Sequence, residues 1–363
     1  MGLATGDLGT REVASRSGGL DATTRLGVQI APSPHLSDTW FTTQRLMGEV
    51  LIALMPVIVM AVLVFRWNAV RQISLCVLAC LAAEAIFARF RGRTAPLHDL
   101  SATLTGLILA LSLPWSSPWY VPVLGSVVAI GLGKAAFGGL GCNLFNPAMV
   151  GRAFVMLAFA REMGASAYVL LDSELSVVTR ATPLSLAKQF AADLAAGRVT
   201  AGEAQVQMEM AESIWALLIG QLNGSLGETS AVAILVGGTY LLIRRVISWE
   251  IPVGILLVSF LFVELGHVFE MTLLGPLQHL ITGSLLFSAF FIATDPVTSP
   301  LTSKGRLFFG MGIGFLLVVI RLFSSYPEGV MFAVLLMNAT VPLLNRWTVP
   351  QPLGGPVPAK AGV

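Results

Sequence analysis

The sequence predicts an all-α integral membrane protein with about ten transmembrane helices in two inverted five-helix repeats. The composition indicates a membrane protein, because apolar residues make up 55% of the 363 residues and charged residues only 12%. A soluble domain has roughly 25% charged residues. The mean hydropathy of +0.80 argues against an ordinary soluble core. A set of matched positions 179 to 180 residues apart indicates the repeat. The net charge of +2 predicts no nucleic-acid partner.

Apolar stretches define the predicted spans, since a transmembrane helix needs about 20 such residues. Ten stretches qualify, of which the third and fifth are short: 47–65, 72–90, 97–113, 119–136, 146–160, 229–245, 250–269, 276–294, 305–322 and 328–346. We therefore divide the chain into five parts. Residues 1–44 form a polar arm without a signal peptide, 45–160 a first repeat and 161–225 a long connection. Residues 226–347 form a second repeat and 348–363 a disordered Pro/Gly-rich tail.

Basic residues predict the orientation of the spans. With a cytoplasmic N-terminus, the inner ends carry Arg45, Arg89, Arg91, Arg93, Lys134, Arg244, Arg245, Lys304, Arg306 and Arg346, whereas the short outer loops carry Arg66, Arg71 and Arg321. This asymmetry is the positive-inside pattern. It predicts that both termini are cytoplasmic and that the 161–225 connection is periplasmic.

The two halves of the chain share positions at a nearly constant offset. The matches are Gly48-Glu49 with Gly227-Glu228, Glu84 with Glu264, Pro96-Leu97 with Pro276-Leu277, and Leu100 with Leu280. Five spans per half is an odd number, so the halves must have opposite topology. Inverted repeats of this kind place functional sites where broken helices meet.

Three carboxylates lie inside or at the end of predicted spans, where a charge costs roughly 2.5–3.5 kcal/mol. Glu84 and Glu264 either hold the bundle together, as protonated or backbone-bonded groups, or form a cation or proton relay. Asp295 stands directly before Pro296, so it either turns a broken helix or contributes oxygens to an ion-entry site. Arg152, in the fifth span, is a candidate to neutralise a carboxylate.

Two further blocks have the composition of ligand sites. The segment 138–151 (GGLGCNLFNPAMVG) combines glycines with Asn143 and Asn146. Its residues favour a tight turn with Asn146 as helix cap before Pro147, with amide contact to a planar ring as the second interpretation. In the block 179–184 (TRATPL), Pro183 biases Thr182 toward an extended conformation, and Arg180 is suited to pair with a phosphate.

These blocks resemble one protein family. Three further blocks share the resemblance: IATDPVTSP at 292–300, YPEGV at 326–330 and GSLGETS at 224–230. The chain is similar to the D subunits of Rnf-type ion-translocating ferredoxin:NAD oxidoreductases, which are relatives of the B subunits of the sodium-pumping NADH:quinone reductases. The resemblance runs from about Pro32 to Asn345, which is nearly the whole membrane part.

The resemblance implies a flavoprotein subunit that couples ferredoxin/NAD electron transfer to Na⁺ or H⁺ transport in the bacterial inner membrane. Thr182 matches the threonine that is esterified to the phosphate of FMN, although Thr179-Arg180 departs from the Ser-Gly that is more common in the quinone-reductase relatives. Asn143 and Asn146 match a region near a non-covalent riboflavin, and Arg152 is a candidate contact of an anionic flavin ring. The implied partners are the C, G, A, E and B subunits of the complex and the lipid bilayer.

Other features narrow the function. We find no Gly-x-Gly-x-x-Gly after a predicted strand, no cysteine run for an iron–sulfur cluster and no metal-ligating set among the three cysteines. The chain is therefore expected to hold flavin rather than NAD or metal. Two alternatives stay open: a subunit of the quinone-reducing sodium pump, and a secondary transporter or channel. Covalent flavin would separate the redox subunit from a transporter.

Overall fold

The computed structural model describes residues 42–92, 97–163, 169–171, 177–179, 187–190, 193, 197–198, 218, 224–269, 272, 275–324 and 329–349. The chain forms two compact units, Met1–Leu46 and Met47–Val363. All the sites described below belong to the second unit.

Within the described residues, five helices are long and apolar enough to cross a membrane: α2 (Thr43–Phe65), α3 (Trp67–Phe90), α12 (Glu250–Val268), α15 (Ser303–Phe323) and α16 (Val330–Thr348). Shorter apolar helices are α4 (Ser101–Ser112), α5 (Tyr120–Val128) with its π-helical continuation η2 (Ala129–Ala135), α6 (Pro147–Ala158) and α11 (Ala231–Ile243). Large apolar side chains such as Leu63, Phe90 and Leu257 are exposed on the long helices, as expected of surfaces that meet lipid or partner helices. The prediction of a helical integral membrane protein is confirmed at this level.

Several short elements connect these helices. Among them are the 3₁₀ turns η1 (Leu97–Asp99) and η4 (Leu226–Glu228) and the one-turn helix α7 (Ala160–Met163). The 161–225 connection also holds a hairpin in which β1 (Val169–Leu171) pairs antiparallel with β2 (Val177–Thr179), with Leu170 opposite Val178. This hairpin is a detail that the all-α prediction did not include, and β-branched residues in β2 favour it.

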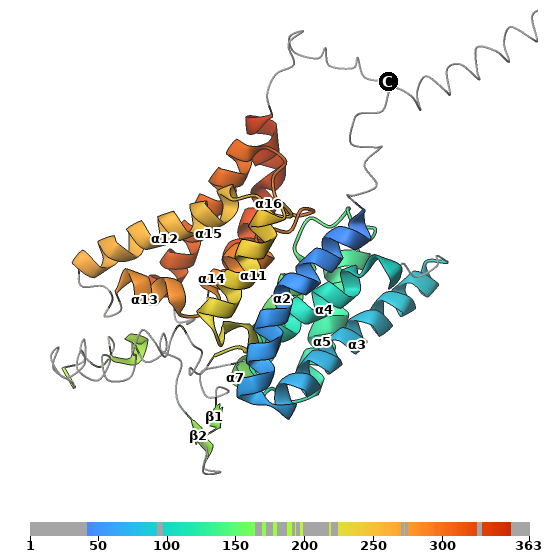
Figure 1. Ribbon diagram of the computed structural model, residues 1–363, viewed down its shortest axis with the longest axis horizontal. Helices are drawn as coiled ribbons and strands as arrows, with labels where there is room; N and C mark the ends of the chain where they lie inside the picture. Colours follow the sequence, from blue (N-terminus) through green and yellow to red (C-terminus); the bar gives the residue numbers. More distant parts are fainter. Residues whose placement is uncertain are drawn as a thin grey trace, which may run out of the picture. The chain divides into compact units, whose positions relative to one another are not determined.

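Small residues bring the helices close together. α3 packs against α4 and α5, and α12 packs against α15, which in turn packs against α16 (Figure 1). A Cβ on Gly106 of α4 would lie 2.8 Å from the Cα of Val77, and a Cβ on Gly310 of α15 would lie 2.6 Å from the carbonyl oxygen of Ile251. Glycine is therefore required at both contacts, as is common where transmembrane helices pack backbone to backbone.

Helix α2 contacts the second half of the chain through α11. The Tyr240 hydroxyl donates to Glu49 Oε2 at 2.6 Å, and the Arg244 guanidinium pairs with the same carboxylate. Gly237 faces the carbonyl of Ala53 so closely that no side chain would fit. Figure 1 shows α2 and α11 side by side. Contacts between residues almost 200 positions apart thus hold the two halves together.

The predicted span 276–294 is not one continuous helix. It consists of α13 (Pro276–Ile281), the short α14 (Leu285–Phe287) and the π-helix η5 (Ser288–Ile292). The chain breaks at Thr282, which is extended, and at Gly283, whose φ of 73° favours glycine. Buried Arg321 of α15 donates to the carbonyl oxygens of His279 at 2.7 Å and Thr282 at 3.0 Å. A side chain from another helix therefore satisfies the carbonyls that the break exposes, as apolar surroundings require.

Candidate functional site

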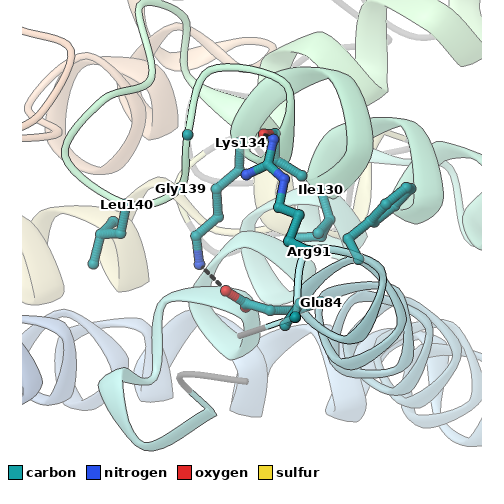
Figure 2. A pocket seen from close by; sticks show the side chains of 11 residues that line it. Glu84, Arg91, Ile130, Lys134, Gly139 and Leu140 are labelled. Carbon is teal, nitrogen blue, oxygen red and sulfur yellow. Dashed lines mark hydrogen bonds and ion pairs between the residues drawn. The ribbon is translucent and has the colours of Figure 1, made fainter. Parts of the chain in front are cut away.

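A pocket of about 590 Å³ lies beside the C-terminal end of α3 (Figure 2). Its walls come from three parts of the chain: the last turns of α3, the π-helix η2 and the glycine-rich loop that follows η2. The lining residues are Glu84, Phe87, Ala88, Arg91, Gly92, Ile130, Lys134, Ala135, Gly138, Gly139 and Leu140. Apolar walls with a few charged groups are typical of small-ligand sites.

Two buried charges meet in this pocket. Glu84 is 6% exposed and Lys134 3% exposed, and the Lys134 ammonium forms an ion pair with Glu84 Oε1, marked in Figure 2. Glu84 Oε2 is buried and accepts no hydrogen bond from the described residues. A buried ion pair with an unsatisfied oxygen is costly for stability alone, so this pair is a candidate functional group.

A line of hydrogen bonds leads away from the ion pair. Lys134 Nζ also donates to Ser101 Oγ at 2.5 Å. The Ser101 hydroxyl in turn donates to Asp99 Oδ1 at 2.6 Å, and its backbone N–H donates to the same oxygen at 2.9 Å. Asp99 is half-buried. Lys134 is therefore held between two carboxylates, one buried and one nearer the surface.

The π-helix η2 explains why the lysine points inward. Gly131 lies against the Phe87 ring, and a Cβ on Gly133 would come within 2.7 Å of the Cα of Pro147. The wider π turn and these glycines let η2 pack closely between α3 and α6. π-helical turns are rare and occur frequently at functional sites. At the rim, exposed Arg91 donates to the carbonyl of Ala135.

Sequence reasoning did not identify the partner of Glu84. It counted Lys134 among the basic residues at the cytoplasmic ends of the spans and gave it no partner, and the structure pairs this buried lysine with Glu84. Neither structural role predicted for Glu84, a protonated or a backbone-bonded carboxyl, matches an ion pair. The signal that could have found it was a lysine within the apolar stretch 119–136, a position as unusual as that of the glutamate.

The other two predicted intramembrane groups have different surroundings. Glu264 is exposed on α12 and does not line the pocket. Arg152 is buried in α6. The structure therefore brings Glu84 together with Lys134, and it leaves Glu264 on the outer surface of the described chain.

The two asparagines of the glycine-rich segment differ in their bonding. Asn146 caps α6, because its Oδ1 accepts from the N–H groups of Ala148 and Met149 at 3.1 and 3.3 Å, with Pro147 at the first helical position. Its Nδ2 donates to the carbonyl of Ile292 at 3.2 Å. The predicted cap is confirmed. Asn143, 5% exposed, donates to the Phe145 carbonyl at 3.3 Å, while its buried Oδ1 has no partner among the described residues.

Asp295 turns the chain after η5. Its Oδ1 accepts from the N–H of Val297 at 3.3 Å, and its Oδ2 accepts from the Thr298 hydroxyl at 3.0 Å. The turning role predicted for this carboxylate is confirmed. The buried Asn338 amide of α16, in the orientation that satisfies its neighbours, donates to the Thr298 carbonyl and accepts from the N–H of Asn146 at 2.9 Å. This amide joins the start of α6 to the Asp295 turn.

Thr182 and Arg180 lie outside the described residues. The chain on their C-terminal side is anchored, because Lys188 donates to the carbonyl of Ser324, just beyond α15, at 2.8 Å. Partial burial, and then the nearby positive charge of Arg321, lower the pKa of Lys188 to about 8. Lys188, six positions after Thr182 in the sequence, is thus attached to the end of a long helix.

Known proteins are similar in sequence to this chain over most of its length. The model of the NQR2, RnfD, RnfE family matches residues 29–354. The chain belongs to this family. It is 37% identical to the D subunit of the Na⁺-translocating ferredoxin:NAD⁺ oxidoreductase complex of Acetobacterium woodii, over 89% of this chain and 94% of the relative. It is 40% identical to the D subunit of the ion-translocating oxidoreductase complex of Stutzerimonas stutzeri, over 86% and 92%, and 39% identical to that of Halorhodospira halophila, over 90% and 95%.

The match to the NQR2, RnfD, RnfE family confirms the resemblance inferred from the sequence blocks. The matched range includes the pocket, the Asp295 turn, the asparagine segment and Thr182. All the candidate site residues therefore lie in the part of the chain that the family shares.

Proposed function

We propose that this chain is the D-type membrane subunit of a redox-driven ion-translocating oxidoreductase. The observation that carries the proposal is the match of nearly the whole chain to the family, with relatives at 37–40% identity that are named as the D subunits of ion-translocating complexes. In this role the chain works with the other subunits of its complex. The complex moves Na⁺ or H⁺ while electrons pass between ferredoxin and NAD.

The proposed architecture is ten spans in two inverted five-helix repeats in the bacterial inner membrane, with both termini cytoplasmic. The order of helices supports it, because α2 to α6 and α11 to α16 each supply five apolar segments. A reporter inserted near Arg93 or fused after Val363 should read cytoplasmic, and one within residues 190–205 should read periplasmic. A cytoplasmic 190–205 segment would contradict the inverted repeat.

The proposed cofactors are FMN, bound as a phosphoester to Thr182 with Arg180 as a phosphate partner, and a non-covalent riboflavin. Asn143 fits a flavin ring, because its buried Oδ1 is free to accept from a ring N–H. Asn146 fits less well, since both atoms of its amide are already bonded. Buried Arg152 is a further candidate ring contact. When bound, a flavin supplies the electron transfer, and the chain supplies its position and surroundings.

Ion coupling is proposed for Glu84 before the other carboxylates. Glu84 is buried, lines a pocket and has an oxygen available to a ligand. Asp295 uses both carboxylate oxygens within its own turn. Glu264 is exposed on α12 and does not line this pocket, so the described chain builds no enclosed site around it.

The covalent flavin is tested by replacing its attachment residue. Thr182→Ala removes the only side-chain oxygen at that position, so the purified subunit should lose fluorescence in a denaturing gel and the mass of FMN in intact-mass analysis. Thr179→Ala is the matched control and should keep both signals. If Thr182→Ala retains the flavin mass, the attachment site is wrong, and Thr179 is the next candidate.

The family model also covers NQR2 proteins, so reduction of a quinone is the second candidate function. A quinone-reduction assay on the intact complex separates the two, because a ferredoxin:NAD enzyme should not need quinone for turnover. A transporter or channel without redox chemistry would carry no covalent flavin, so the Thr182 experiment also tests that alternative.

A further inference from the structure

We propose that Lys134 is a tethered competitor for a monovalent cation that binds Glu84 inside the pocket. In this arrangement the lysine ammonium occupies the carboxylate until a cation from solution replaces it. The inference rests on the proposed function, because it assigns ion binding to Glu84, and it adds the residue that regulates this binding.

The first observation is the free oxygen of Glu84. The carboxylate side chain is 7% exposed, and its Oε2 accepts no hydrogen bond from the described residues although it is buried. Buried carboxylate oxygens are almost always bonded, because an unsatisfied one loses its hydration without compensation. The same side chain lines a pocket of about 590 Å³, which is large enough to admit a cation. Hard cations take oxygen ligands, so Oε2 is a suitable first ligand.

The second observation is that Lys134 has another place to bond. Its ammonium donates both to Glu84 and to the Ser101 hydroxyl, which donates to Asp99. When a cation neutralises Glu84, Lys134 keeps Ser101 and lies one hydrogen bond from the Asp99 carboxylate. Neither state then leaves a buried charge without a partner, which is the condition for two states of similar free energy.

Among the described residues that line the pocket, the one further charged side chain does not replace Lys134. Arg91 is exposed, and its guanidinium is bonded to the carbonyl of Ala135. Its charge is therefore screened more strongly than that of the buried ammonium. The other lining side chains, including Phe87 and Ile130, are apolar. The Glu84 carboxylate can thus pair either with the Lys134 ammonium or with a cation that enters the pocket.

A purely structural ion pair makes a different prediction. If the pair only holds α3 to η2, removing the lysine destabilises the protein and leaves its response to Na⁺ unchanged. If Lys134 competes with the cation, removing it makes Na⁺ bind more tightly, because the cation no longer displaces a charge. The Na⁺ dependence therefore distinguishes the two roles.

The experiment uses the full-length chain purified in detergent and measures its thermal unfolding midpoint against NaCl concentration, with choline chloride keeping the ionic strength constant. The wild type should be stabilised by Na⁺ in a saturable way. Lys134→Gln should lower the half-saturating Na⁺ concentration at least tenfold. Lys134→Arg keeps the competing charge and should show no such decrease. Glu84→Gln should remove the response.

Ser101→Ala is a second, milder variant for the case in which Lys134→Gln does not fold. It removes the hydroxyl that holds the displaced ammonium, so it should raise the half-saturating Na⁺ concentration severalfold. The competitor role is overturned if Lys134→Gln folds and binds Na⁺ no more tightly than the wild type, or if Ser101→Ala leaves the Na⁺ curve unchanged. A midpoint that responds to pH but never to Na⁺ overturns the cation site itself.

Failure of this inference is distinguishable from failure of the proposed function. Thr182→Ala should leave the Na⁺ response intact, because this variant changes neither Glu84 nor Lys134. If the wild-type chain carried no covalent flavin but still bound Na⁺ at Glu84, the proposed flavin role would fail and the competitor role of Lys134 would stand.

Discussion

Glu84 and Glu264 lie 180 positions apart in helices α3 and α12, both long enough to cross a bilayer, yet their surroundings are opposite. Glu84 is buried and paired with Lys134, which a π-helix carries into the same pocket. Glu264 is exposed on its helix. The difference teaches that an apolar run alone does not determine the environment of its carboxylate. The neighbouring helix does, through the side chains and the backbone geometry it presents.

The largest effect should come from breaking the buried pair on one side. Lys134→Met leaves Glu84 buried without its counter-ion, so in Na⁺-free buffer we expect a loss of about 3–5 kcal/mol. Glu264→Gln changes an exposed side chain and should stay within about 0.5 kcal/mol of the wild type. Thermal unfolding of the detergent-purified variants measures both. Equal effects would mean that the two glutamates are not in different environments.

Removing both charges should cost less than removing one. In the double variant Glu84→Gln/Lys134→Met, no uncompensated charge remains, and we expect at least about 2 kcal/mol of the loss to be recovered. The same thermal unfolding assay, applied to the wild type, both single variants and the double variant, gives the coupling free energy between Glu84 and Lys134. A double variant as unstable as the sum of the single variants would show that the ion pair does not couple them.

The two asparagines sharpen the comparison at a smaller scale. Asn146→Ala removes a helix cap and the bond to Ile292, so we expect a loss of about 1–2 kcal/mol. Asn143→Ala removes one bond to a backbone carbonyl and should cost less, while lowering the riboflavin content of the folded protein. Unfolding midpoints and extracted flavin are the measurements. The reverse order of stabilities would contradict the capping role.

The smallest effect concerns a second lysine. Partial burial, and then the like charge of Arg321, lower the pKa of Lys188 to about 8 from 10.5. Between these values the unfolded chain binds more protons than the folded chain, so stability should rise with pH from about 8 to about 10.5. Lys188→Gln should flatten this rise in the unfolding midpoint. An identical pH profile in the variant would remove Lys188 from the explanation.

Local features were predictable from the sequence. The apolar stretches 72–90 and 250–269 closely match α3 and α12, because length and apolarity alone define such helices. The cap at Asn146 followed from one residue and the proline after it. The turn at Asp295 followed in the same way.

Long-range features were not predictable from a single sequence. Lys134 is 50 positions from Glu84, and nothing local pairs a glutamate in one apolar stretch with a lysine at the end of another. The break at Thr282 and Gly283 depends on Arg321, about 40 positions away. These features depend on how the helices pack, which hydrophobic patterns do not determine.

The contact between α2 and α11 has a consequence for biosynthesis. Glu49 accepts a hydrogen bond from Arg244, which is 195 positions later in the chain, so α2 leaves the ribosome long before its partner α11 exists. At synthesis rates of 5–20 residues per second, the delay is roughly 10–40 s. During that time the Glu49 carboxylate and the narrow contact at Ala53 face other surroundings. The newly made first half therefore lacks its contacts with α11 until the second half is synthesised. During this time it is a suitable client for the membrane insertion machinery and its chaperones.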